Sequence, residues 1–217
     1  MTQWELEGGG LERDAVAAAD RFDPAGLLQD LGRRGGVVVV SALDRPVRVL
    51  DLGSGGGDLV QRLSRLARAD GIHATWVGAD PDPRAHAATA RHAASGVRFV
   101  RTGSSELRDA GERFDAVVSN HVLHHLDAAS LAAFADDSLA LADGPVLHAD
   151  IARSRTAYGL YAVGITPLAP GTFLRTDGLR SIRRSYTAAE LGATLGPGWR
   201  VEQPAAFRVL AIGDGRA

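Results

Sequence analysis

One run of the sequence limits the possible folds of this chain more than any other, because it joins a strand, a glycine-rich turn and a helix. Apolar residues from Val47 lead to Asp51, four glycines follow between Gly53 and Gly57, and apolar residues then recur at helical spacing from Leu59. Glycine is needed where the chain adopts a positive φ angle and where a ligand lies directly against the backbone. The run therefore predicts a nucleotide-binding turn in an α/β fold.

The register of the glycines argues against a dinucleotide-binding fingerprint. That fingerprint, G-x-G-x-x-G/A, uses its third glycine to let the helix pack closely on the strand. If the pattern starts at Gly53, its third position is Asp58, and if it starts at Gly55, its third position is Val60. Neither residue suits this packing role, so a nucleotide-dependent oxidoreductase is the less favoured alternative. Glycine-rich turns also occur in α/β proteins that bind no ligand.

A second acidic residue ends the next apolar run. Residues 75–79 have the pattern of a short strand that ends at Asp80, 29 residues after Asp51, and one βαβ unit takes about 30 residues. Asp82, with a proline on each side, is suited to cap the helix that follows. Because Asp82 supplies this cap, we expect the carboxylate of Asp80 to accept hydrogen bonds from the hydroxyls of a ribose.

A third motif lies between Phe114 and Leu126, with the sequence F-D-A-V-V-S-N-H-V-L-H-H-L. It predicts a strand that ends at Asn120 and is followed by three histidines. Asp51, Asp80 and Asn120 would then end three successive parallel strands. Such ends meet at the carboxyl edge of one sheet, where α/β folds bind their ligands.

These three motifs, in this order, resemble those of the class I S-adenosylmethionine-dependent methyltransferases, and the resemblance covers residues 48–151 strongly. It implies that the glycine turn passes beneath the methionine part of the cofactor S-adenosylmethionine. It also implies that the acid after the second strand holds the ribose, that the next two residues border the adenine, and that the fourth strand ends at the transferable methyl. The implied cofactor-binding residues are Asp51, Gly53, Ser54, Gly55, Gly57, Asp80, Pro81, Asp82, Gly103, Ser104, Asn120 and His121.

One position departs from the pattern of that family. After the third strand the family usually has an aspartate that accepts from the adenine amino group, whereas this chain has Gly103 and Ser104 there. We expect adenine to be recognised by backbone groups or by the serine hydroxyl. The departure also leaves open an alternative, a catalytically inactive protein that binds S-adenosylmethionine.

The histidines after the fourth strand are the candidate catalytic residues. Methyl transfer from a sulfonium is an in-line displacement, and a base is needed only if the acceptor must lose a proton during the attack. A histidine, with an ordinary pKa near 6.5, suits that task at neutral pH. His121 and His124 are therefore the predicted catalytic residues. Together with His125 and Asp150 they could be imagined as a metal site, but histidines that line a cofactor pocket explain the spacing, and we expect no metal.

The remaining pattern predicts a Rossmann-like α/β fold with a seven-stranded, mostly parallel sheet, an antiparallel last strand and helices on both faces. A helical N-terminal cap is expected over residues 1–46 and a cofactor-binding core over residues 47–217, with a lid at about 152–186 after the fifth strand. Strands are predicted near 47–53, 73–80, 97–102, 114–120, 145–151, 199–204 and 206–212, and core helices near 57–69, 82–94 and 127–142.

The expected lid carries the candidate substrate contacts. Its aromatic residues could line an apolar pocket and its arginines could bind a carboxylate or a phenolate. The segment S-I-R-R-S-Y-T and the segment D-I-A-R-S resemble those of small bacterial methyltransferases that act on polyketide phenols and quinones. The candidate substrate residues are His148, Asp150, Arg153, Tyr158 and Arg184, with Arg175, Arg183 and Tyr186 as further possibilities.

Composition narrows the function classes. The net charge of −2 and the isoelectric point of about 6.4 provide no overall attraction to nucleic acid. The chain has no cysteine, so thiolate catalysis and zinc–cysteine sites are excluded. No apolar run reaches the ~18 residues of a membrane span, and we expect a cytoplasmic enzyme. The predicted activity is methyl transfer to oxygen or ring carbon of a small aromatic, phenolic or quinone-type metabolite. The sequence does not predict the oligomeric state.

Overall fold

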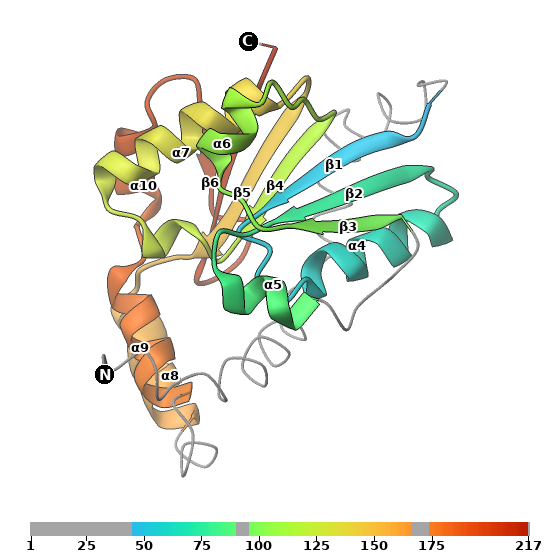
Figure 1. Cartoon of the computed structure of the whole chain (residues 1–217). Helices are drawn as coiled ribbons and strands as arrows, with labels where there is room; N and C mark the ends of the chain where they lie inside the picture. The colour runs from blue at the N-terminus through green and yellow to red at the C-terminus, as the bar shows by residue number, and fades with distance from the viewer. Residues whose placement is uncertain (1–44, 90–95, 166–173, 217) are drawn as a thin grey trace.

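The strands expected along the sequence pair into one sheet. The computed structural model describes residues 45–89, 96–165 and 174–216, and in these residues seven strands have the order β3-β2-β1-β4-β5-β7-β6 (Figure 1). The helical cap expected over residues 1–46 lies outside the described residues, except for its last two. The strands are β1 (Val47–Leu52), β2 (Ala74–Ala79), β3 (Val97–Val100), β4 (Ala116–Asn120), β5 (Pro145–Ile151), β6 (Arg200–Glu202) and β7 (Arg208–Asp214).

The sheet topology confirms the expected fold class. Strands β1 to β5 pair in parallel, whereas β7 lies between β5 and β6 and pairs antiparallel with both. The chain adds β2 and β3 on one side of β1 and then β4 and β5 on its other side. The strand order therefore reverses between β1 and β4. The crevice at the carboxyl ends of these two strands is the place where open α/β sheets bind ligands.

Helices cover both faces of the sheet, as expected. Along β1, Val47 and Val49 pack in the core cluster that contains residues of α4, while Leu50 and Leu52 pack in the cluster that contains residues of α7 and α10. In the described part of the chain, no helix is both long enough and apolar enough to cross a membrane. The helices are α4 (Asp58–Ala69), α5 (Pro83–Thr89), α6 (Ser104–Asp109), η2 (Leu123–His125), α7 (Ala128–Leu141), α8 (Arg155–Gly164), α9 (Leu174–Arg184) and α10 (Ala188–Leu195).

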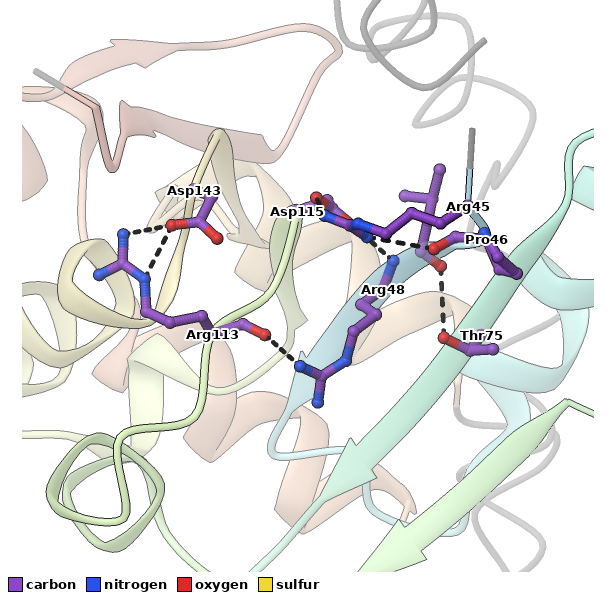
Figure 2. Close-up of polar contacts among 8 residues, drawn as sticks. Arg45, Pro46, Arg48, Thr75, Arg113, Asp115 and Asp143 are labelled. Carbon is purple, nitrogen blue, oxygen red and sulfur yellow. Dashed lines mark hydrogen bonds and ion pairs between the residues drawn. The ribbon is translucent and has the colours of Figure 1, made fainter. Parts of the chain in front are cut away.

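Charged residues fasten the amino edge of the sheet, opposite the ligand-binding edge. The guanidinium of Arg45 donates two hydrogen bonds of 2.7 Å to the carboxylate of Asp115, and the backbone N–H of Arg48 donates a third, of 2.8 Å (Figure 2). The hydrogen bonds from Arg45 lower the pKa of Asp115. Asp115, the acid of the F-D pair in the third motif, thus ties the start of β4 to β1 and has a structural role.

The segment expected as a lid contains two helices that the sequence pattern does not predict. Helices α8 and α9 lie side by side and project away from the sheet (Figure 1). They approach each other closely, since a Cβ at Gly178 would lie 2.3 Å from the ring of Tyr161. Helix α9 also lies against η2, the turn that carries two of the three histidines.

Candidate functional site

The glycine turn is held against the end of the neighbouring strand β2. The backbone N–H groups of Gly53 and Ser54 donate to the carbonyl of Ala79 at 2.8 and 3.1 Å. The backbone N–H of Gly55 donates to the carboxylate of Asp80 at 2.9 Å. These bonds fix the turn at the carboxyl edge, beside the point where the strand order reverses.

Two glycines of the turn serve different purposes. Gly53 has a φ of 71°, and a Cβ there would lie 2.5 Å from the side chain of Val122, so the position is closed by packing. Gly55 has a φ of 52°, but a Cβ there would meet no atom of the described residues within 4 Å. Gly55 therefore offers bare backbone on an open side, which suits a ligand that lies against the turn.

Asp51 is a buried acid for which the described residues supply no hydrogen-bond partner. It is 1% exposed, and neither of its carboxylate oxygens is hydrogen-bonded. It sits in register with Gly78 of β2 and Val118 of β4. Burial, and secondarily the charge of Asp80, raises the pKa of Asp51 to about 8. A buried acid of this kind is stabilised as a carboxylate when a cationic group binds beside it, and the ammonium of S-adenosylmethionine is such a group.

Asp80 keeps acceptor positions for a ligand. Its Oδ1 accepts from the backbone N–H of Asp82 at 2.8 Å, and its Oδ2 accepts from Gly55. Since a carboxylate offers about four acceptor positions, both oxygens can also accept from a ribose. Asp82 caps α5 as expected, because its carboxylate accepts from the backbone N–H of Arg84 at 2.8 Å. The side chain of Arg84 also donates to Asp82 and lowers its pKa.

Gly103 and Ser104, which stand where the family usually has an adenine-binding aspartate, are hydrogen-bonded within the protein. The hydroxyl of Ser104 donates to Asp137 of α7 at 2.7 Å, and the backbone N–H of Gly103 donates to Glu106 at 2.6 Å. Both lie at the start of α6, which the sequence pattern does not predict. The hydroxyl proton of Ser104 is thus directed toward Asp137. The side chain can therefore act toward a ligand as a hydrogen-bond acceptor, through its oxygen.

The end of β4 is shaped by a strained backbone. His121 has a φ of 60°, which is uncommon for a residue other than glycine. Its N–H still donates to the carbonyl of Ala149 in β5 at 3.0 Å. Beside it, the amide oxygen of Asn120 accepts from the guanidinium of Arg208 at 3.3 Å. Arg208 was not among the expected site residues, because it lies 88 residues from Asn120 in sequence and meets it only when β7 pairs with β5.

His121, His124 and Asp150 come together at this edge. His124 Nδ1 lies 2.7 Å from Asp150 Oδ1, the N–H of His124 donates to Oδ2 at 3.0 Å, and His121 Nδ1 lies 4.0 Å from Oδ1. Burial lowers the pKa of His121 to about 4, against the opposing effect of Asp150. Burial acts to raise the pKa of Asp150, but the hydrogen bond from His124 and the neighbouring rings outweigh it and the pKa is lowered. A neutral imidazole thus faces a carboxylate.

His148 lies away from this edge. Its ring is fully buried between Phe134 and Trp199, with centroid distances of 5.0 and 5.3 Å. Its Nδ1 is 2.7 Å from the hydroxyl of Ser119, and burial lowers its pKa to about 3. His148 is a neutral core residue beneath α7, and this position does not support the substrate contact expected from the sequence.

The other candidate substrate residues are spread along the lid segment. Arg153 forms an ion pair with Glu190 at the surface. Tyr158 is half-buried in α8, and Arg184 is an exposed residue of α9 whose charge acts on His125. The hydroxyl of Tyr186, a further possibility, donates to the carbonyl of Leu126 at 2.7 Å and fastens the end of the lid to the loop after η2.

Comparisons with known proteins agree with this geometry. Residues 49–142 match a family model described as a methyltransferase domain. Two relatives are both named ubiquinone biosynthesis O-methyltransferase. The Brucella ovis protein is 33% identical over 121 residues, which are 54% of this chain and 46% of that protein. The Mesorhizobium japonicum protein is 29% identical over 178 residues, which are 73% of this chain and 69% of that protein. The chain thus spans about half the length of the first relatives that it matches.

A solved structure shows the same fold. The plantazolicin methyltransferase, crystallised with S-adenosylhomocysteine and a substrate analogue, has a TM-score of 0.64 at 11% identity, and the likeness covers 93% of this chain and 88% of that one. The motif order, the strand order and the matched family model point the same way. Residues 49–142 of this chain are thus similar to a methyltransferase domain, and its fold is similar to that of a methyltransferase crystallised with S-adenosylhomocysteine.

Proposed function

We propose that this protein transfers a methyl group from S-adenosylmethionine to an oxygen of a small metabolite, and that the acceptor is a phenolic or quinol hydroxyl. The observation that carries the proposal is the pairing of the buried Asp51, which has no hydrogen-bond partner among the described residues, with the backbone of Gly55, against which none of these residues packs. The names of the relatives that act in ubiquinone biosynthesis support oxygen as the acceptor atom.

In this proposal the cofactor is held by groups of complementary charge and shape. Asp51 faces the methionine ammonium, Gly55 lies beneath the methionine chain, and Asp80 accepts from the ribose hydroxyls. S-adenosylmethionine supplies an electrophilic methyl on a sulfonium. What the protein adds is position, because holding an acceptor oxygen in line at about 3 Å removes most of the entropic cost of the reaction.

The acceptor side of the proposed site lies at the ends of β4 and β5. Asn120 and His121 border the place where the methyl is expected, and His124 and Asp150 lie behind them. A hydroxyl becomes a better nucleophile as it loses its proton, so this cluster is suited to an acceptor that ionises. Helix α9 lies against η2, which supports a role for the segment 152–186 as a lid over the acceptor. The cytoplasm remains the proposed place of the reaction.

Binding of S-adenosylhomocysteine, measured by calorimetry, tests the cofactor part. We expect one site per chain, and Asp80→Ala should weaken binding by about 10- to 100-fold, because charged hydrogen bonds contribute about 1.5–3 kcal/mol. Asp109→Ala, a change at an exposed acid on α6, is the matched control and should leave affinity unchanged. A folded protein that does not bind the product, or equal affinities for all three proteins, would contradict the proposal.

Methyl transfer from labelled cofactor tests the acceptor part. The protein is assayed with matched aromatic acceptors that differ in one group: a phenol, its aniline and its O-methyl ether. Transfer to the phenol alone is expected. Transfer to the aniline at the same rate, or to the ring carbon of the ether, would assign the enzyme to nitrogen or carbon instead.

A further inference from the structure

The cluster at the ends of β4 and β5 has the composition of a metal-binding site. His121, His124 and Asp150 each offer one nitrogen or oxygen atom, and these three atoms lie within 4.8 Å of one another. They come from β5 and from the residues that follow β4, and the sheet holds these two strands side by side, since Asn120 pairs with Ala149. The spacing of the histidines in the sequence led us to expect no metal, but their arrangement around Asp150 favours one. We infer that these three residues bind a divalent first-row transition-metal ion, with zinc as the representative, and that the ion activates the acceptor hydroxyl.

The distances suit such an ion after small side-chain movements. Ligand atoms about 2.0–2.2 Å from a metal lie roughly 3–3.5 Å apart when they are neighbours in a tetrahedral site. Here Asp150 Oδ1 lies 2.7 Å from His124 Nδ1 and 4.0 Å from His121 Nδ1. Movements of less than about 1 Å would therefore bring all three atoms to coordinating distance. On binding, the ion would replace the proton now shared between His124 and Asp150.

The charge of these three side chains and the additional hydrogen bonds to the carboxylate of Asp150 favour the binding of a cation. Asp150 is 2% exposed, and its oxygens also accept from the backbone N–H groups of His124 and Ile151, at 3.0 and 2.6 Å. Such contacts orient a ligating carboxylate, as in known metal sites. As metal ligands, two imidazoles and one carboxylate contribute a charge of −1, which a divalent ion and one acceptor oxygen anion would bring to zero.

The site is open on one side and strained on another. His121 is the least buried of the three, with 30% of its side chain exposed. Its left-handed backbone is uncommon for a residue other than glycine, and such strain is concentrated at functional positions. Three protein ligands with an open position are typical of catalytic rather than structural zinc sites. Imidazole nitrogen disfavours magnesium and calcium, which prefer oxygen.

The metal site adds a mechanism to the proposed function, and it rests on that function because the reaction is taken to be methyl transfer to a hydroxyl. The acceptor hydroxyl binds at the open position and its proton leaves to solvent. Its oxygen then attacks the methyl carbon, so that the O–C bond forms while the S–C bond breaks and the electron pair returns to sulfur. The products are the methyl ether, S-adenosylhomocysteine and one proton. The ion thus allows the acceptor hydroxyl to lose its proton without a side chain that acts as a base.

Cobalt binding to tag-free, chelator-treated protein tests the site independently of methyl transfer. Bound cobalt absorbs visible light, and we expect one equivalent to bind and zinc, which suits the same nitrogen and oxygen ligands, to compete with it. His121→Ala and Asp150→Asn should weaken binding more than about 100-fold, since even second-contact changes cost about 10- to 100-fold. His125→Ala, which removes a neighbouring exposed histidine, is the matched control and should bind like the parent.

Far-ultraviolet circular dichroism shows that each variant is folded, and His121→Ala decides the test if Asp150→Asn does not fold. A folded protein that binds no cobalt, or a His121→Ala variant that binds it as well as the parent, would overturn the metal site and leave a His124–Asp150 hydrogen bond. The chelated enzyme should keep its affinity for the product but lose methyl transfer until zinc is restored. Full activity without metal would overturn the role of the ion while leaving the proposed methyl transfer intact.

Discussion

Asp51 should make the protein less stable as the pH rises, and Asp51→Asn should remove this effect. The folded protein holds the acid neutral up to a pH near its pKa of about 8, whereas the carboxyl group in the unfolded chain ionises near its ordinary pKa of 3.8. Folding must therefore take up a proton throughout this interval. The sign is that of a raised acid pKa: the contribution of Asp51 is most favourable below pH 3.8 and becomes steadily less favourable up to about pH 8.

The magnitude follows from the pKa difference. Each pH unit between the two pKa values costs about 1.4 kcal/mol. Between pH 5 and pH 7 the free energy of unfolding of the parent should therefore fall by about 2.5 kcal/mol relative to that of Asp51→Asn. The comparison with the variant at each pH cancels the titration of all other groups.

Urea unfolding at pH 5, 6 and 7 measures this difference. Asp136→Asn, a change at an exposed acid on α7, is the matched control and should follow the parent at every pH. A constant difference between the parent and Asp51→Asn would refute the reasoning, because it would mean that Asp51 ionises alike in both states. Calorimetry adds a second reading: binding of S-adenosylhomocysteine at pH 7 should release close to one proton from the parent and fewer from the variant.

Two further predictions concern stability and the turn. Gly55→Ala should cost roughly 1 kcal/mol in stability through its left-handed backbone and weaken cofactor binding. Gly53→Ala, which also meets Val122 at 2.5 Å, should destabilise the fold more; equal costs in urea unfolding would contradict the packing difference. His148→Gln should make the protein less sensitive to acid. Burial lowers the pKa of His148 to about 3, so between pH 7 and pH 5 this histidine takes up a proton only in the unfolded chain, and the free energy of unfolding of the parent should fall by about 2 kcal/mol relative to that of the variant. Parallel pH profiles for the parent and this variant would show that His148 is not buried as a neutral ring.

Local patterns predict the sheet well. Strands β1, β2 and β5 were expected within one residue of their observed bounds, because each is an apolar run limited by turn residues. Asp51, Asp80 and Asn120 were placed at strand ends for the same reason. Helix α6 was not expected, since its six residues contain a single buried apolar side chain, Leu107, and so have no helical periodicity. Helices α8 and α9 were not predicted either. They pack mainly on each other and not on the sheet, so their residues do not show the apolar pattern of a helix that covers a sheet.

The chemical environment of the site depends on distant contacts and is harder to predict. The sequence shows that His124 and Asp150 exist, but their hydrogen bond forms because β4 and β5 are neighbours. His148 has the same residue type as His124 and lies only two residues before Asp150 on β5, yet it is enclosed by Phe134 and Trp199. Only the structure distinguishes a core histidine from one at the edge.

The position of β7 has a consequence for synthesis of the chain. β7 pairs with β5 along its whole length, from Pro145 opposite Asp214 to Ile151 opposite Arg208. During translation, β5 and the His124–Asp150 pair are made about 60 residues before their partner strand, which takes several seconds at about 5–20 residues per second. Until then the edge of β5 is an open template for other strands. A ribosome-bound chain is thus expected to be most prone to misassociation after the acceptor side has been made and before β7 has emerged.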